Sequence, residues 1–213
     1  TTTSGVSGAP ASVEYVYDGW QVIEERDGSG SLMRRFVMGL GVDEPLQLEN
    51  ISFWPNAGTY HYQRSTLGNV VALTNSSGAV VERYSFDAYG SPQFENASNV
   101  DQSLSESAYG NPYLFQGRRY EPWLYAVYEY RTRMYSPEMG RFVQRDSIGV
   151  WGDPGQFGNP FSFVSSAPAN ATDPFGLEVV LWTRPVDSSA GLGSLAPLPH
   201  KSIQISPAGS ADY

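Results

Sequence analysis

The 213-residue sequence contains no cysteine, and only 16% of its residues are charged. Without cysteine the chain has no disulfide, no thiolate nucleophile and no cysteine-based zinc site. Lysine and arginine number 13 against 22 aspartates and glutamates, for a net charge of −9. Because phosphate binding needs clustered positive charge, this balance argues against nucleic acid as the main partner. No apolar run reaches the roughly 18 residues of a membrane-spanning helix, so we expect no membrane span.

Aromatic residues, glycine and proline are abundant instead. Aromatics make up 14% of the chain, with 14 tyrosines, and there are 22 glycines and 15 prolines. Aromatic side chains pack well on a pleated sheet, and glycine and proline mark turns. This composition predicts an all-β protein made of short strands and frequent turns.

Short alternating segments separated by turn residues predict antiparallel hairpins. Segment 13–17 stops at Asp18-Gly19, and segment 79–86 stops at the DAYG of 87–90. The pattern Tyr-x-Tyr-Asp-Gly of the first returns as Tyr-x-Phe-Asp-x-Tyr-Gly in the second. Repeated units of this size bury their faces against neighbouring units, so we expect an array of hairpins. The polar stretch 91–108 indicates a surface loop.

Changes of composition predict four segments. Residues 1–12 read as a linker, and 13–108 as the hairpin repeats. Aromatic and arginine residues become dense over 109–177, and the composition changes again over 178–213. A short helix is expected near Pro137–Gly140.

Four motifs in the third segment carry a resemblance. They read NPYLFQGRRY at 111–120, YRTRMYSPEMGRFVQRD at 130–146, NPFSFV at 159–164 and DPFGL at 173–177. Together they resemble the RHS repeat-associated core domain, and the upstream hairpins are similar to YD repeats. The first of the family's two Asp-Pro-x-Gly motifs is represented here by DSIG at 146–149, with serine in place of proline.

The resemblance implies a fold, a location and partners. Antiparallel YD hairpins would run into a compact coiled β-plug, as a fragment of a hollow β-shell. The protein would be bacterial, and secreted or on the cell surface. Its partners would be the upstream shell repeats and a C-terminal effector of the same polypeptide, with residues 178–213 as the start of the variable region. No cofactor and no metal are implied.

The resemblance also implies self-cleavage. Asp146 and Asp173 would act as an aspartic-protease-like pair, and Arg145 would bias which carboxylate stays charged. Two carboxylates held close together share a proton, so one can activate water while the other donates to the carbonyl oxygen. They titrate as a unit, so their roles are not separated.

The cut would fall between Leu177 and Glu178. Pro174 and Gly176 would form the sharp turn that presents the Leu177 carbonyl. Because the substrate is tethered to the same chain, positioning it costs little.

Two other functions remain open. The first is a structural or adhesive module in which the two aspartates only form turns. The second is a sugar-binding module with exposed aromatic rings. His200, at the head of a predicted strand, would suit the base of a papain-like effector, but the chain supplies no cysteine to complete one.

Overall fold

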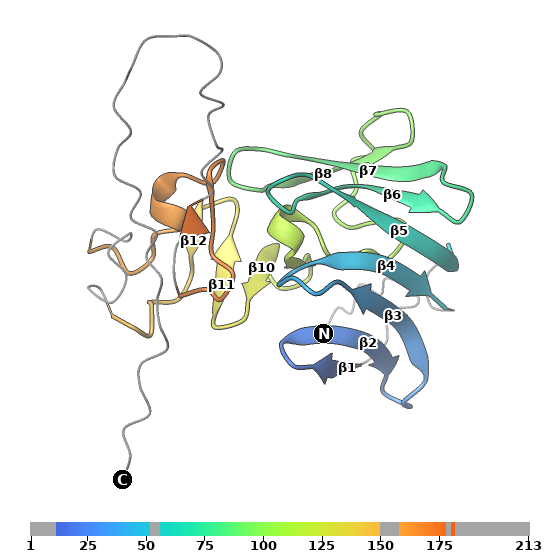
Figure 1. Ribbon diagram of the computed structural model, residues 1–213, viewed down its shortest axis with the longest axis horizontal. Coiled ribbons are helices and arrows are strands. Elements are labelled where there is room, and N and C mark those ends of the chain that lie inside the picture. The colour runs from blue at the N-terminus through green and yellow to red at the C-terminus, as the bar shows by residue number, and fades with distance from the viewer. Residues whose placement is uncertain (1–11, 52–55, 150–157, 178–179, 182–213) are drawn as a thin grey trace, which may run out of the picture. The chain divides into compact units, whose positions relative to one another are not determined.

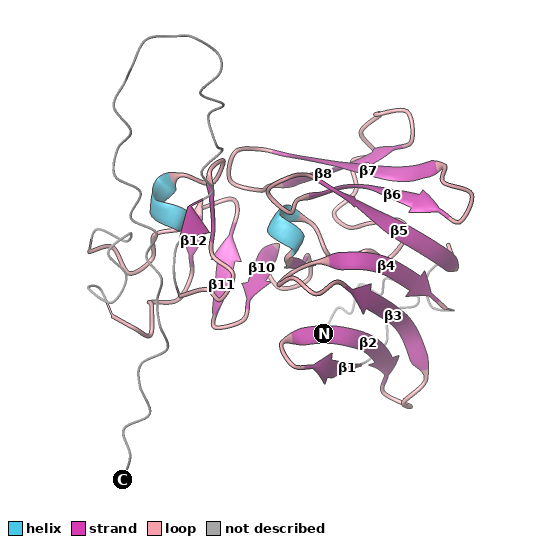
Figure 2. Ribbon diagram, in the orientation of Figure 1, coloured by secondary structure: helices cyan, strands magenta, loops and turns pink. Residues whose placement is uncertain are grey.

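Antiparallel β-strands make up almost all of the regular structure (Figures 1 and 2). The computed structural model describes residues 12–51, 56–149, 158–177 and 180–181. The prediction of an all-β, antiparallel fold is confirmed. Within the described residues, no helical segment has the length and apolar character needed to cross a bilayer.

An eight-stranded sheet occupies the first half of the chain. Its strands lie side by side in chain order, each antiparallel to the next, as the blue-to-green run in Figure 1 shows. This order is what consecutive hairpins produce. The strands are β1 (Val13–Asp18), β2 (Gln21–Asp27), β3 (Leu32–Met38), β4 (Pro45–Asn50), β5 (Gly58–Arg64), β6 (Val70–Asn75), β7 (Val80–Phe86) and β8 (Pro92–Asn96).

The same side-chain-capped turn recurs along this sheet. At Asp87, the carboxylate Oδ1 accepts hydrogen bonds from the backbone N–H groups of Tyr89 and Ser91, both at 2.9 Å. Asp27, Asn75 and Asn96 bind the backbone N–H groups two and four residues further on in the same way. Asx side chains cap turns because their oxygen reaches the backbone two residues on. An Asp or Asn at the end of a strand, or directly after it, therefore caps each of these turns.

Strand β8 corrects one prediction. Residues 91–108 were expected to form a surface loop, yet Pro92–Asn96 pairs with β7 over its whole length. Phe94 is the reason, because its ring is buried against Tyr84 in a T-shaped contact. One aromatic residue among polar ones gives too short an alternation to predict a strand. The strand forms because its backbone pairs with β7.

A second group of strands follows the large sheet. Its four-stranded sheet has the order β12-β11-β10-β9, and a two-stranded sheet pairs β13 with β14. Gly140 closes a turn by donating its N–H to the Pro137 carbonyl at 3.2 Å, so the short helix predicted there is wrong. The elements are η1 (Phe115–Gly117), β9 (Arg119–Glu121), β10 (Val127–Tyr130), β11 (Arg133–Ser136), β12 (Arg141–Phe142), η3 (Val164–Ser166), β13 (Ala171–Thr172) and β14 (Val180–Leu181).

One buried aromatic cluster joins the two sheets. Tyr128, Tyr130 and Tyr135 are fully buried, and further contacts cross from the large sheet, such as Phe36 on Tyr113 at 5.1 Å between ring centroids. Aromatic residues bury more area than any others, so this cluster dominates the packing. The core therefore runs across the boundary predicted near residue 108. That boundary and the other segment limits remain predictions.

Buried ion pairs reinforce the junction. Glu25 on β2 has no exposed surface and lies 2.5 Å from Arg34 on β3 and 2.5 Å from Arg119 on β9. A buried carboxylate is tolerated when cations and hydrogen bonds surround it. Glu25 therefore fixes the second group of strands against the first hairpins.

Glu82 is a second buried carboxylate, and it has a different environment. Its oxygens accept hydrogen bonds from Tyr84 at 2.5 Å, from the backbone N–H of Ala108 at 2.8 Å, and from the Ser107 hydroxyl. Burial raises the pKa of Glu82 above its ordinary value, and these hydrogen bonds oppose the rise. Hydrogen bonds to the Glu82 carboxyl group thus hold residues 107–108 against the sheet. Burial makes this carboxyl group harder to ionise than an exposed one.

Stability should consequently depend on pH through Glu82. Because its pKa is raised on folding, the folded chain holds this proton more tightly, and the contribution to stability is lost as pH rises through the folded-state pKa. Between pH of about 4 and about 7, we expect the unfolding free energy of wild type to fall relative to Glu82→Gln. Urea unfolding across this range measures the difference. The exposed Glu14→Gln is the control, and a parallel pH profile for both variants would contradict the assignment.

Candidate functional site

The two aspartates singled out from the sequence each cap a tight turn. Oδ1 of Asp146 accepts the N–H of Ile148 at 3.0 Å, and Oδ1 of Asp173 accepts the N–H of Leu177 at 3.0 Å. This is the capping already seen at Asp87 in the large sheet. One oxygen of each carboxylate is therefore used locally, and Oδ2 is left to face other parts of the chain.

Arg133 on β11 joins the two carboxylates. Its Nη1 lies 2.9 Å from Oδ2 of Asp146, and its Nη2 lies 3.2 Å from Oδ2 of Asp173. All three residues are buried, with exposed fractions of 4%, 6% and 2% respectively. The guanidinium also stacks 3.6 Å from the centroid of the Phe142 ring. A planar fork with several donors suits this task, since it can bind two carboxylates at once.

The tip of the β10–β11 hairpin holds the carbonyls that precede Leu177. Nε of Arg133 donates to the Gly176 carbonyl at 2.5 Å. The Thr132 hydroxyl lies 2.9 Å from the carbonyl oxygens of both Phe175 and Gly176. The segment 173–177 is thus held by its own turn on one side and by this hairpin tip on the other.

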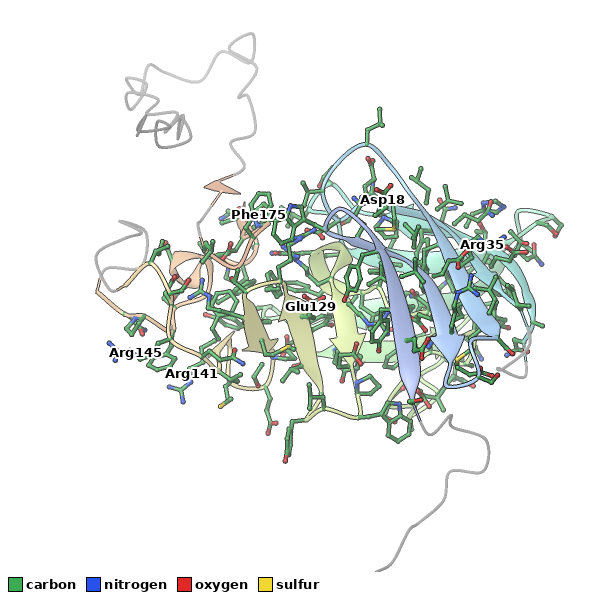
Figure 3. The ribbon with its side chains drawn as sticks, turned by 90° about the horizontal axis from the view of Figure 1, so that it is seen from below. Asp18, Arg35, Glu129, Arg141, Arg145 and Phe175 are labelled. Carbon is green, nitrogen blue, oxygen red and sulfur yellow. The ribbon has the colours of Figure 1, made fainter. Side chains whose placement is uncertain are left out.

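Arg145 lies elsewhere. Its side chain is exposed, and Figure 3 shows it pointing outward, away from Phe175. Arg145 was predicted to lie beside the carboxylates. Arg133 lies there instead. The available signal was strand alternation, because Arg133 shares a face of β11 with the buried Tyr135. A charged residue in a buried row needs a partner, and that partner is an acid.

A two-stranded ladder flanks the predicted cut. β13 pairs with β14 through Ala171 with Leu181 and Thr172 with Val180. In the sequence, Leu177 lies between β13 and β14, and its side chain is half-buried. Pro174 and Gly176 lie in the predicted turn. Glu178, the segment 151–157 and His200 lie outside the described residues.

A cavity of about 390 Å³ reaches Asp173. Its walls come from residues 41–44, from 64–68, and from Gln116, Arg118, Thr172 and Pro174. A space of this size can hold water. Burial lowers the pKa of Arg118, and the nearby Asp43 carboxylate opposes that change. No group of three or more His, Asp or Glu side chains among the described residues is placed to bind a metal ion.

The sequence is similar to several large bacterial proteins, although no family model matches it. It is 27% identical over 169 residues to tRNA nuclease WapA of Bacillus subtilis, and 28% identical over 169 residues to the tRNA3(Ser)-specific WapA of Bacillus spizizenii. Toxin protein Tse5 of Pseudomonas aeruginosa is 39% identical over 70 residues, a third of this chain. The chain spans 6% of each WapA and 5% of Tse5.

Solved structures share the fold. TcdB2-TccC3-Cdc42 superposes with a TM-score of 0.54 at 16% identity, covering 72% of this chain and 7% of that one. The Tc holotoxin pore of Photorhabdus luminescens gives 0.52 at 17% identity, with the same coverage. Fold and sequence likeness together support a relation to RHS-related toxin proteins. In fold, the chain is an antiparallel β-module like that of these structures.

Proposed function

We propose that this segment plugs the end of an RHS-type β-shell and cleaves its own chain between Leu177 and Glu178. The observation that carries the proposal is the bridge from Arg133 to Asp146 and Asp173. It brings two carboxylates from separate turns to one buried point, on the turn that ends at Leu177. Clusters of buried ionisable groups such as this one occur often at functional sites.

Hydrolysis would use these groups as follows. A carboxylate accepts a proton from water, whose oxygen attacks the Leu177 carbonyl carbon. That proton passes to the Glu178 nitrogen as the peptide bond breaks, leaving a new carboxyl group on Leu177. Arg133 supplies positive charge where negative charge develops. The cavity beside Asp173 would give water a route to that carboxylate.

The wider setting follows from the same proposal. The predicted segments at 13–108 and 109–177 would be the YD repeats and the RHS core domain, and 178–213 the start of the released effector. The protein would be a secreted or cell-surface bacterial toxin component. Its partners would be its own effector and the upstream repeats of the same polypeptide.

A non-cleaving structural module is the second candidate, and one observation favours it. Each aspartate already has a structural task, since Oδ1 caps a turn and Oδ2 binds Arg133. The sugar-binding alternative has less support. The most exposed rings of the described residues, Trp20, Trp123 and Tyr125, lie in turns, whereas Tyr128, Tyr130 and Tyr135 are fully buried and present no ring face to a ligand.

Neutralising either aspartate tests the cleavage. With an affinity tag after residue 213, we expect wild type to divide after Leu177, as read by denaturing gel and intact mass. Asp146→Asn and Asp173→Asn should each slow cleavage by roughly 100-fold or more, because general acid–base groups contribute about 10²–10⁴-fold. Asparagine keeps the turn, since Asn75 and Asn96 cap the same turn elsewhere in the chain.

Asp87→Asn is the matched control. It makes the same change in a turn of the same geometry, far from Arg133 in sequence, and should leave cleavage unaltered. A wild-type chain that stays intact would support the structural module instead. Undiminished cleavage in either aspartate variant would contradict the role of the pair.

A further inference from the structure

The hairpin between β3 and β4 reaches the candidate site through Asp43. Oδ2 of Asp43 lies 3.0 Å from Nη2 of Arg118, and Oδ1 lies 2.7 Å from Nη2 of Arg131. Arg118 and Arg131 follow η1 and β10, so Asp43 joins the eight-stranded sheet to two separate places in the second group of strands. Both guanidinium groups are largely buried, with side-chain exposures of 3% and 8%.

The same two arginines hold the start of the turn that ends at Leu177. Nη2 of Arg118 donates to the Asp173 carbonyl at 2.8 Å and also to the Pro174 carbonyl. Nη1 of Arg131 donates to the Pro174 carbonyl as well. Two cations meeting on one carbonyl oxygen repel each other, and an anion between them offsets that repulsion. Asp43 supplies this anion.

The hairpin is seated firmly enough to place a charge. The Asp43 carbonyl oxygen comes so near to Gly117 that a Cβ there would lie only 2.3 Å away. The neighbouring Glu44 braces the hairpin by accepting the Gly41 N–H at 2.9 Å and by pairing with Arg64 at 2.7 Å. Backbone contact and ion pairs together therefore determine the position of Asp43.

We propose that Asp43 is a positioning residue for cleavage after Leu177, acting through Arg118 and Arg131 on the Pro174 carbonyl. The inference rests on the proposed function. Its consequence is a coupling between folding and chemistry, because the docked β3–β4 hairpin of the large sheet supplies part of the contacts that hold this turn. A chain whose repeat sheet has not folded would cleave this bond more slowly.

Asp43→Asn in the full 213-residue chain tests the coupling. We expect cleavage to slow by at least tenfold, with Glu49→Gln, on strand β4 of the same hairpin but paired to the exposed Arg35, close to wild type. Arg131→Gln should slow cleavage too. If both residues act through one contact, the double variant should be no slower than the slower single variant. Cleavage of Asp43→Asn at the wild-type rate would overturn the inference and leave the proposed function intact.

A second measurement does not depend on cleavage. In the Asp146→Asn background, hydrogen exchange of the peptide that spans 173–177 reports the Leu177 amide, which is bonded to Asp173. Adding Asp43→Asn should speed that exchange at least tenfold, while adding Glu49→Gln should not. Unchanged exchange would overturn the inference, even if wild type never cleaves. If wild type stays intact but Asp43→Asn speeds the exchange, the proposed cleavage is ruled out. That result would still support the role of Asp43 in positioning this turn.

Discussion

Replacing Arg133 with methionine is expected to lower the free energy of unfolding by about 3–5 kcal/mol, the usual cost of removing one partner from a buried ion pair. Arg133 is 4% exposed and lies between Asp146 and Asp173, which are themselves buried. Methionine keeps much of the side-chain volume, so the loss comes chiefly from two buried carboxylates that no longer share a cation. Urea unfolding at neutral pH measures the change.

Arg145→Met is the matched control, because that arginine is exposed. Its effect should stay within about 0.5 kcal/mol, as for most surface substitutions. Adding Asp146→Asn and Asp173→Asn to Arg133→Met should recover part of the lost stability, since removing a whole buried ion cluster costs less than removing one member. Equal losses for Arg133→Met and Arg145→Met would show that the bridge does not form in solution.

Gly176→Ala is expected to cost roughly 2–5 kcal/mol, adding the strain of a left-handed alanine to that of overpacking. Gly176 has a φ of +68°, and a Cβ there would lie 2.3 Å from the Tyr130 carbonyl oxygen and 2.8 Å from the Thr132 hydroxyl. The nearer atom belongs to the backbone of β10, so it cannot move aside without disturbing the sheet. Cleavage should be lost as well, because the turn carrying Leu177 would be displaced.

Gly149→Ala separates conformational strain from crowding. Gly149 closes the corresponding turn at Asp146 with a φ of +82°, but a Cβ there meets nothing within 4 Å. Its cost should therefore be only the left-handed penalty of about 1–2 kcal/mol. Thermal and urea unfolding of the two variants provide the comparison. If both alanine variants lose the same free energy of unfolding, the close approach of Gly176 to the Tyr130 carbonyl oxygen does not contribute to the cost.

Local sequence patterns predicted the hairpins because their determinants are local. An Asx residue whose side chain binds the backbone N–H groups two and four residues on contains all the information for its turn, as at Asp27 and Asp87. Strand β8 was missed because Phe94 is its one deeply buried residue, and its pairing with β7 is a tertiary contact. The short helix expected near residue 137 failed for a similar reason, since neighbouring strands β11 and β12 pair directly across that turn.

Some residues of the candidate site could be predicted from the sequence, and others could not. The resemblance to the RHS core domain pointed to both aspartates and to the turn that ends at Leu177, whereas an Asp-containing turn by itself indicated only a structural role. The arginine between the aspartates could not be predicted, because Arg145 is adjacent in sequence while Arg133 is adjacent in space. Nothing in the alternation of 41–44 indicated that Asp43 would meet Arg118 and Arg131, which follow it by some eighty residues.

By itself the sequence determined the strand-and-turn character of the chain and the absence of cysteine from it, since both depend on residue type and short-range spacing. The two aspartates of the candidate site came from the resemblance to the RHS core domain. The tertiary structure alone decided which cation joins those aspartates and which distant hairpin reaches the same turn. The physical reason is that charge pairing acts through distance in space, and a folded sheet brings together groups that the chain keeps apart.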